Sequence, residues 1–147
     1  MKAKILFFLL YISLVSCDFN KKYHNRESDF NDASDVVQSF YKFLQQGKND
    51  MAFSLIHPSV WKQNDSVKLS QYFINMGKLQ NESVKRTIDH WTTDLVVGYQ
   101  PSSSYKLYYI DQYKNFSLKV SISLIKDRSL GIKIIGYNAG EKEFSNN

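Results

Sequence analysis

The chain has 147 residues, a formal net charge of +5 and a single cysteine. This length suits one domain, which buries about two thirds of its unfolded surface and needs no disulfide to fold. One cysteine excludes a disulfide framework within the chain. Basic residues are interspersed with acidic ones along the sequence, which is not the pattern of a nucleic-acid-binding protein. Aromatic residues make up 15% of the chain, and this favours strands and a packed interior over disorder.

The first 16 residues have the layout of an export signal. Lys2 and Lys4 form a basic start, an apolar run extends from Ile5 to Ile12, and small residues lead to Cys17. The apolar run is shorter than the roughly 20 residues that a membrane-spanning helix needs. The sequence therefore predicts a signal peptide over residues 1–16. Without its two lysines, the mature chain would carry a net charge of +3 instead of +5.

The segment Leu14-Val15-Ser16-Cys17 resembles the signal motif of bacterial lipoproteins, in which an aliphatic residue and two smaller residues precede a cysteine. That resemblance implies that Cys17 carries the lipid and becomes the first residue of the mature chain. The protein would then be anchored to a membrane of the bacterial cell envelope. A conventional secretory signal cut after Cys17 is the alternative, and it would leave neither a cysteine nor an anchor.

Residues 18–31 are polar and charged without an apolar period, so we expect a flexible tether from the lipidated cysteine to a folded domain at 32–140. The first helix of that domain should start at Asp32 or Ser34 and end at Gly47. Its apolar stripe consists of Val36, Val37, Phe40, Phe43 and Leu44. A short helix over about residues 49–56 should be stopped by Pro58, with Trp61 covering the core. A third helix should start at Ser66.

After the helices the period changes to alternation, which predicts strands. The first covers about residues 84–93, with Arg86, Ile88 and His90 on one face and Trp91 and Thr93 on the other. A loop is expected over 98–104 and an aromatic-rich strand over 105–113. From Phe116 to Leu124 the alternation is strict and predicts a central strand with its even-numbered residues in the core. A turn at 127–131, a strand at 132–137 and a disordered tail at 141–147 complete the chain.

This order of elements predicts an α+β domain with N-terminal helices packed on a curved antiparallel sheet. The segments at Gly47, His57-Pro58 and Gly136-Tyr137 resemble the NTF2-like, or cystatin-like, superfamily. In that group the first helix ends at a glycine, a short helix leads into a polar turn, and the last strand closes on a Gly-Tyr pair. The resemblance covers about residues 33–139. It implies a sheet bent into a cone, whose open end is an enzyme pocket in some relatives and a binding site in others.

Polar side chains of the strands are the candidates to line such a cavity. Tyr105, Tyr109, Tyr113 and Trp91 are the candidate ligand-binding residues, since their rings and polar tips suit binding. Asp111 is the candidate catalytic residue, because residues two apart on a strand share a face and Asp111 would lie beside Tyr109 or Tyr113. A carboxylate base opposite a tyrosine donor is the arrangement of ketosteroid isomerase.

The histidines predict neither a dyad nor a metal site. Asp89 and His90 are neighbours on a predicted strand, so their side chains should point to opposite faces. His24, His57 and His90 lie far apart, without metal-ligand spacing. The sequence has no phosphate-binding glycine loop or nucleophile motif, so no metal or cofactor is expected.

The sequence favours a membrane-anchored envelope lipoprotein that binds a small apolar ligand, a peptide or a protein partner without catalysis. Nucleic acid is not an expected partner. Two alternatives stay open. One is a small isomerase- or dehydratase-like enzyme that uses a carboxylate in the cone, and the other is an immunity or inhibitor lipoprotein. A buried ionisable group in the pocket would separate the enzyme from the binding protein.

Overall fold

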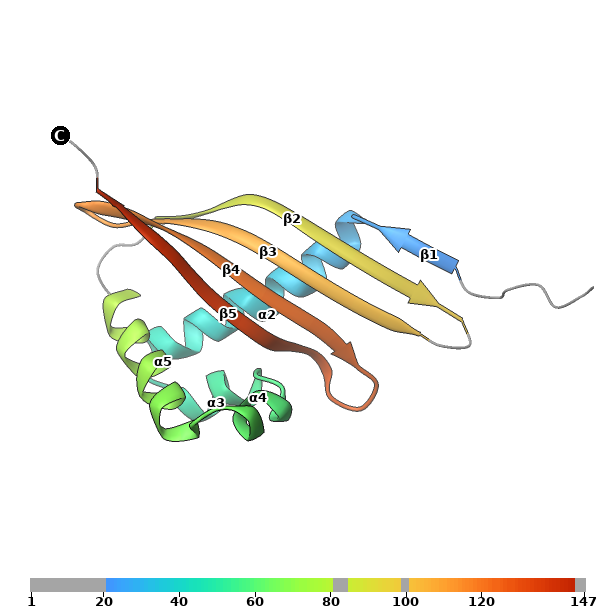
Figure 1. Cartoon of the computed structure of the whole chain (residues 1–147), viewed down its shortest axis with the longest axis horizontal. Helices are drawn as coiled ribbons and strands as arrows, with labels where there is room; N and C mark the ends of the chain where they lie inside the picture. Colours follow the sequence, from blue (N-terminus) through green and yellow to red (C-terminus); the bar gives the residue numbers. More distant parts are fainter. Residues whose placement is uncertain (1–20, 81–84, 99–100, 145–147) are drawn as a thin grey trace, which may run out of the picture.

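The structure is a computed structural model that describes residues 21–80, 85–98 and 101–144. Within these residues, four helices pack on an open, curved, five-stranded antiparallel sheet (Figure 1). The predicted α+β class is therefore confirmed. The predicted signal peptide, Cys17 and residues 18–20 of the predicted tether lie outside the described residues.

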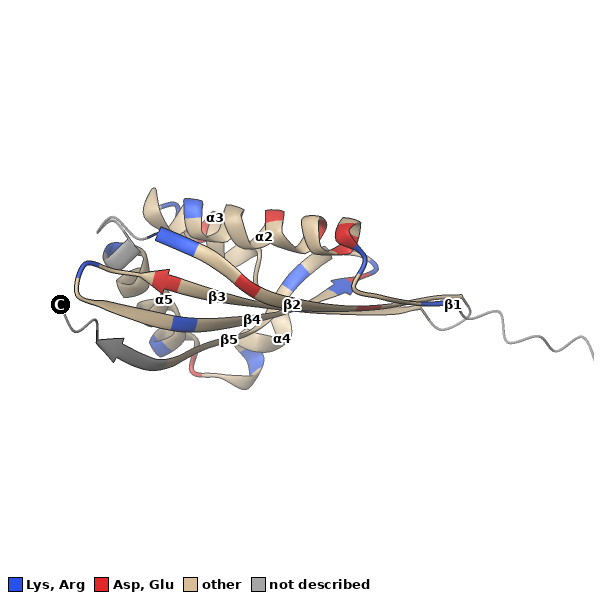
Figure 2. Cartoon of the chain, turned by 90° about the horizontal axis from the view of Figure 1, so that it is seen from above, with Lys and Arg blue, Asp and Glu red and all other residues tan. Residues whose placement is uncertain are grey.

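The elements follow one another along the chain, and each strand pairs antiparallel with the next. Figure 2 shows α2 as a layer against the sheet. The elements are β1 (Lys21–His24), α2 (Glu27–Gln45), α3 (Asn49–Ser54), α4 (Pro58–Gln63), α5 (Ser66–Gln80), β2 (Lys85–Val97), β3 (Ser102–Gln112), β4 (Phe116–Asp127) and β5 (Gly131–Phe144).

The tether predicted over residues 18–31 is wrong from Lys21 onward. Lys21–His24 form β1, which pairs with the last four residues of β2. The first helix then begins at Glu27, and not at Asp32 or Ser34. β1 lies at the edge of the sheet with mostly exposed side chains, so it carries no apolar period that the sequence could reveal. The ordered domain therefore includes residues from Lys21 onward.

Three other predicted boundaries are also corrected. Pro58 begins α4, because the first position of a helix needs no backbone N–H donor. Ser102–Ser104 belong to β3 and not to a loop, since they pair with β2. The last strand continues to Phe144, paired with β4, so the predicted tail is strand over residues 141–144. Residues 145–147 lie outside the described part of the chain.

The core forms where α2 and α5 cover the middle of the sheet. β4 lies between β3 and β5, which confirms the predicted central strand. Of the even-numbered residues predicted for the core, Phe116 and Leu118 are only partly buried, whereas Val120, Ile122 and Leu124 are at most 1% exposed. They pack with Val37, Phe40, Tyr41, Leu44, Phe73, Met76, Leu107 and Ile134.

A close approach of α5 to α2 depends on Gly77. A Cβ atom at this position would lie 2.8 Å from the carbonyl oxygen of Leu44, which is closer than real Cβ contacts. Gly77 is buried inside α5, so the helix continues through the glycine instead of ending there. The glycine allows the two backbones to pack together.

A β-bulge between Ile88 and His90 changes the face of β2 that meets the helices. Before the bulge Arg86 faces α2, where it stacks on the Tyr41 ring, and after it Trp91 faces α2, where it stacks on Phe30. The prediction that Arg86 and Trp91 lie on opposite faces is therefore wrong, because an inserted residue reverses the alternation.

Candidate functional site

A cavity of about 460 Å³ lies between α2 and the strands β2 and β3. Its apolar walls are Phe30, Val37 and Ile88, and α2 adds the polar side chains of Asn31, Ser34, Asp35 and Gln38. Tyr41, Arg86 and Tyr109 complete the lining. A cleft of this size, with apolar walls and a few polar groups, is typical of small-molecule sites.

The central feature of this site is an ion pair between Arg86 and Asp111. The two residues lie opposite each other on β2 and β3. The Nε and Nη2 groups of Arg86 each donate a hydrogen bond of 2.6 Å to one oxygen of the Asp111 carboxylate. Asp111 is fully buried, and the Arg86 side chain is 19% exposed. A paired and doubly hydrogen-bonded geometry is what makes a buried charge tolerable.

Two tyrosine rings surround the guanidinium of Arg86. Its Cζ atom lies 3.2 Å from the centre of the Tyr41 ring and 5.7 Å from that of Tyr109. Burial is the largest single influence and would lower the pKa of Arg86, but the hydrogen bonds to Asp111 and the electrostatic effects of Tyr41, Asp111 and Tyr137 together outweigh it and hold the pKa above its usual value. Arg86 therefore stays charged.

The tyrosines next to the ion pair stay protonated. Burial raises the pKa of Tyr109, and it raises that of Tyr41 well above the usual value of 10.0. Among the described residues, neither hydroxyl has a hydrogen-bond partner of good geometry, although Tyr137 lies close enough to Tyr41, and Ser34 to Tyr109, to influence the pKa. The hydroxyls of Tyr41 and Tyr109 are thus neutral donors beside the cavity.

The structure brings some of the candidate residues together and separates others. Asp111 and Tyr109 share the face of β3 that meets α2. Tyr105 is buried in the core without lining the cavity. Trp91 reaches the site indirectly, since its ring stacks on Phe30 with centroids 5.0 Å apart. Tyr113 follows the end of β3 and stacks on Phe116, with ring centroids 4.4 Å apart.

Arg86, Tyr41 and Ser34 are the site residues that the sequence reasoning missed. Arg86 could have been found from the sequence by pairing the two strands. A hairpin of β2 and β3 that turns between Val97 and Ser102 places Arg86 opposite Asp111 or its neighbour. A buried aspartate on a strand requires such a cation. Tyr41 and Ser34 have no comparable signal, since both lie outside the apolar stripe assigned to the first helix.

The prediction that Asp89 and His90 point to opposite faces is wrong. The Nδ1 atom of His90 lies 2.8 Å from the Asp89 carboxylate, and both side chains are about half exposed. The bulge at this point of β2 brings the neighbours together. His90 also stacks on Tyr108, with ring centroids 3.9 Å apart. This pair lies at the surface and does not line the cavity between α2 and the sheet.

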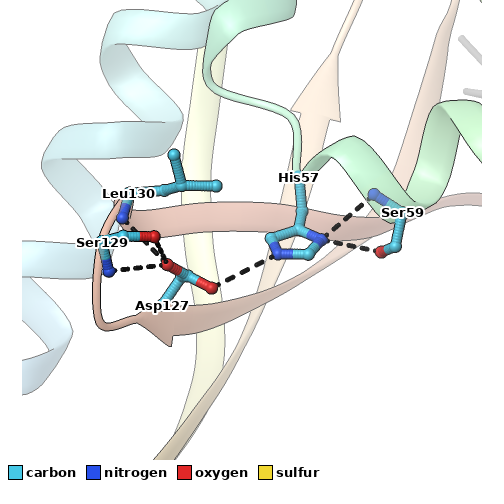
Figure 3. Close-up of polar contacts among 5 residues, drawn as sticks. All are labelled: His57, Ser59, Asp127, Ser129 and Leu130. Atoms are coloured by element: carbon cyan, nitrogen blue, oxygen red, sulfur yellow. Dashed lines mark hydrogen bonds and ion pairs between the residues drawn. The ribbon is translucent and has the colours of Figure 1, made fainter.

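A second polar cluster joins α4 to the turn between β4 and β5 (Figure 3). His57 Nδ1 accepts hydrogen bonds from the Ser59 backbone N–H at 3.2 Å and from its hydroxyl at 2.7 Å. His57 Nε2 lies 3.7 Å from Asp127. This Ser-His-Asp order resembles a hydrolase triad, but the distance to Asp127 exceeds that of a hydrogen bond. His57 is the residue that caps α4, which is a structural role.

Asp127 in turn holds the β4–β5 turn. Its Oδ1 atom accepts hydrogen bonds from the N–H and hydroxyl of Ser129 and from the N–H of Leu130. These bonds, chiefly those from Ser129, lower the pKa of Asp127 to about 2. The main chain of the α3–α4 connection also bonds β5, since Ile134 exchanges hydrogen bonds with Leu55 and His57. The cluster therefore secures the edge strand against the helices.

Comparison of the chain with known protein families, proteins and structures identifies no relative. No protein-family model matches the chain, and no curated protein or solved structure is significantly similar to it. The NTF2-like resemblance therefore stays a prediction. In the described part of the chain, no three His, Cys, Asp or Glu side chains gather in a way that could hold a metal ion. No helix in this part is both long and apolar enough to cross a membrane.

Proposed function

We propose that this protein is a lipid-anchored envelope protein whose α+β domain binds a small uncharged, amphipathic molecule in the cavity between α2 and β2–β3. The observation that carries the proposed binding is the cavity itself, whose lining combines apolar side chains with Tyr41, Tyr109 and Arg86. Arg86 is in turn held by buried Asp111. The lipoprotein motif ending at Cys17 supports the anchor.

The same geometry disfavours the isomerase-like alternative. A general base needs a carboxylate oxygen within reach of the substrate proton. Both oxygens of Asp111 accept hydrogen bonds from Arg86, and the residue is fully buried. Tyr113, one of the proposed donors, lies beyond the end of β3. Asp111 is therefore better suited to fix the cavity wall than to remove a proton.

The charges of the site favour an uncharged ligand. Arg86 and Asp111 neutralise each other, and Asp35 adds an exposed carboxylate to the lining of the cavity. An anionic ligand would meet that carboxylate, and Arg86, the one cation among the described residues that line the cavity, is already paired with Asp111. An aromatic or aliphatic body could pack on Phe30 and Ile88, while Ser34 and Gln38 supply hydrogen bonds.

N-phenyl-1-naphthylamine is a suitable probe because it is uncharged, aromatic and brightly fluorescent only in apolar surroundings. The protein from Asp18 onward should bind it with energy transfer from Trp91, which can be isolated by the substitution Trp61→Phe. Ser34→Leu should fill part of the cavity and weaken binding by about tenfold or more, equivalent to at least 1.4 kcal/mol.

Ser28→Leu is the matched control, because Ser28 lies on the same helix but is exposed. Probe affinity in this variant should equal that of the unsubstituted protein. If Ser34→Leu binds the probe as tightly as Ser28→Leu, the cavity is not the binding site.

The anchor is tested separately by fractionation and mass spectrometry of the full chain. The mature N-terminal peptide should begin at Cys17 with acyl chains attached, and the protein should sediment with membranes. Each buried methylene of an acyl chain adds about 0.8 kcal/mol to membrane binding. A soluble mature chain that begins at Asp18 would establish conventional secretion instead.

A further inference from the structure

Basic side chains cluster at one end of the sheet, where β1 begins at Lys21. Lys21 pairs with Val97, directly before the β2–β3 turn. The β4–β5 turn lies at the same end of the sheet (Figure 1), beside the ends of β2 and β3 in a groove lined by Val97, Lys126 and Arg128. We call Lys21, Lys22, Val97, Lys126 and Arg128 the basic end.

All five side chains of the basic end are exposed. Four are cationic, and the fifth, Val97, is an apolar side chain that is 47% exposed. The basic residues of β1 are visible in Figure 2. The nearby carboxylate of Asp127 is a single negative charge against these four cations, with one oxygen bonded to the N–H groups of its own turn and the other 3.7 Å from His57. Exposed cations next to an exposed apolar side chain are complementary to an anionic lipid surface.

The short distance from Cys17 to the sheet supplies an independent argument. Only residues 18–20 separate Cys17 from Lys21, where β1 begins. Four residue steps of fully extended chain span at most about 14 Å. A lipid on Cys17 would therefore hold the start of β1 within about 14 Å of the headgroups, although the sequence alone predicted a longer tether.

We infer that the basic end is a membrane-contacting surface that docks the domain on anionic phospholipid headgroups. This inference rests on the proposed lipid anchor for its geometry, and it adds a fixed orientation. The sheet stands on the membrane by its basic end, and the β3–β4 turn at Lys114–Asn115 points away. β3 has 11 residues, so this turn lies about 35 Å from the basic end.

The orientation is tested with the full lipidated chain in vesicles. A lipid on Cys17 blocks its thiol, so a cysteine introduced at Val97 or Asn115 is the only site for a thiol-reactive nitrobenzoxadiazole label. Vesicles of phosphatidylglycerol and phosphatidylcholine should contain a lipid with a nitroxide quencher on its headgroup. We expect loss of most emission from a label at position 97 and almost none from a label at position 115. Equal quenching at the two positions would overturn the inference.

Charge reversal tests the role of the basic side chains. In anionic vesicles, Lys126→Glu combined with Arg128→Glu should reduce quenching at position 97 to the level seen in pure phosphatidylcholine. Lys68→Glu combined with Lys78→Glu is the matched control, since both lysines are exposed on α5, and it should leave quenching unchanged. If quenching at position 97 is the same with and without the charge reversal at the basic end, and the same in anionic and pure phosphatidylcholine vesicles, docking on anionic headgroups is refuted.

The outcomes separate this inference from the proposed function. If Cys17 carries lipid but the labels at positions 97 and 115 are quenched equally, the proposed lipid anchor is supported and the proposed docking surface is refuted. If mass spectrometry shows that Cys17 is cleaved off, the anchor fails. The same vesicles then test the basic end alone, and a chain that fails to sediment with anionic vesicles would refute docking as well.

Discussion

Removing one partner of the Arg86–Asp111 pair should be among the most costly substitutions in the domain. Arg86→Met keeps an unbranched, flexible side chain but removes the guanidinium and leaves the carboxylate of Asp111 without its two hydrogen-bond donors. Since Asp111 is fully buried, its charge would then lack the partner that makes burial tolerable. Breaking a buried pair in this way costs about 3–5 kcal/mol.

The loss is measurable as a change in thermal unfolding followed by circular dichroism. For a domain of this size, about 1 kcal/mol corresponds to roughly 4 °C in Tm. Arg86→Met should thus lower Tm by about 12–20 °C. Lys68→Met removes one partner of an exposed pair with Asp65, and it should change the free energy of unfolding by less than about 0.5 kcal/mol.

The double variant Arg86→Met with Asp111→Leu separates burial of a lone charge from loss of packing. It replaces both charges with apolar groups, so most of the stability should return, to within about 1–2 kcal/mol of the original. A cost below about 1 kcal/mol for Arg86→Met alone, or a double variant no better than the single one, would contradict the buried pair.

Three further predictions concern the register of β4, helix packing and the β4–β5 turn. Ile122→Ala should lower the free energy of unfolding by about 2–4 kcal/mol and Ser121→Ala by less than about 0.5, and equal losses in urea unfolding would contradict the register. Gly77→Ala should destabilise by about 1–2 kcal/mol despite the higher helix propensity of alanine, because its Cβ meets the backbone of α2. A stabilised variant would contradict that contact. The carboxyl of Asp127 should titrate near pH 2 by NMR, and Ser129→Ala should move its pKa toward 3.8. Because the folded pKa is lowered, the stabilisation by Asp127 is present above about pH 4 and is lost as the pH falls toward 2. An unshifted titration would contradict the turn geometry.

Strong local patterns made much of the fold predictable. The alternation from Phe116 to Leu124 correctly predicted a central strand and the burial of Val120, Ile122 and Leu124, because one face of the sheet meets the helices and the other does not. The glycine at position 47 adopts a positive φ of 67° at the end of α2, as expected of a helix C-terminus. These features depend on neighbours in sequence, which periodicity reports directly.

Features that depend on distant partners were not predicted. β1 is held by its pairing with β2, some 70 residues away, so its own polar sequence gave no signal. The bulge in β2 reversed the alternation and placed Arg86 and Trp91 on one face. Asp111 was predicted as the candidate catalytic residue, but the structure pairs both of its carboxylate oxygens with Arg86 on the neighbouring strand. The chemistry of the site therefore depends on which residues of β2 and β3 lie opposite each other, more than on the residue composition of these strands.

The most direct test of the binding site is the NMR signal of the Arg86 side chain. Its Nε–H donates to a buried carboxylate, and Arg86 lines the cavity that we propose as the binding site. We expect a resolved, slowly exchanging Nε–H signal that shifts when N-phenyl-1-naphthylamine is added, while exposed Arg128 exchanges rapidly and does not respond. An Arg86 signal that exchanges as rapidly as that of Arg128, or that stays unchanged at saturating probe, would contradict a ligand site built on the Arg86–Asp111 pair.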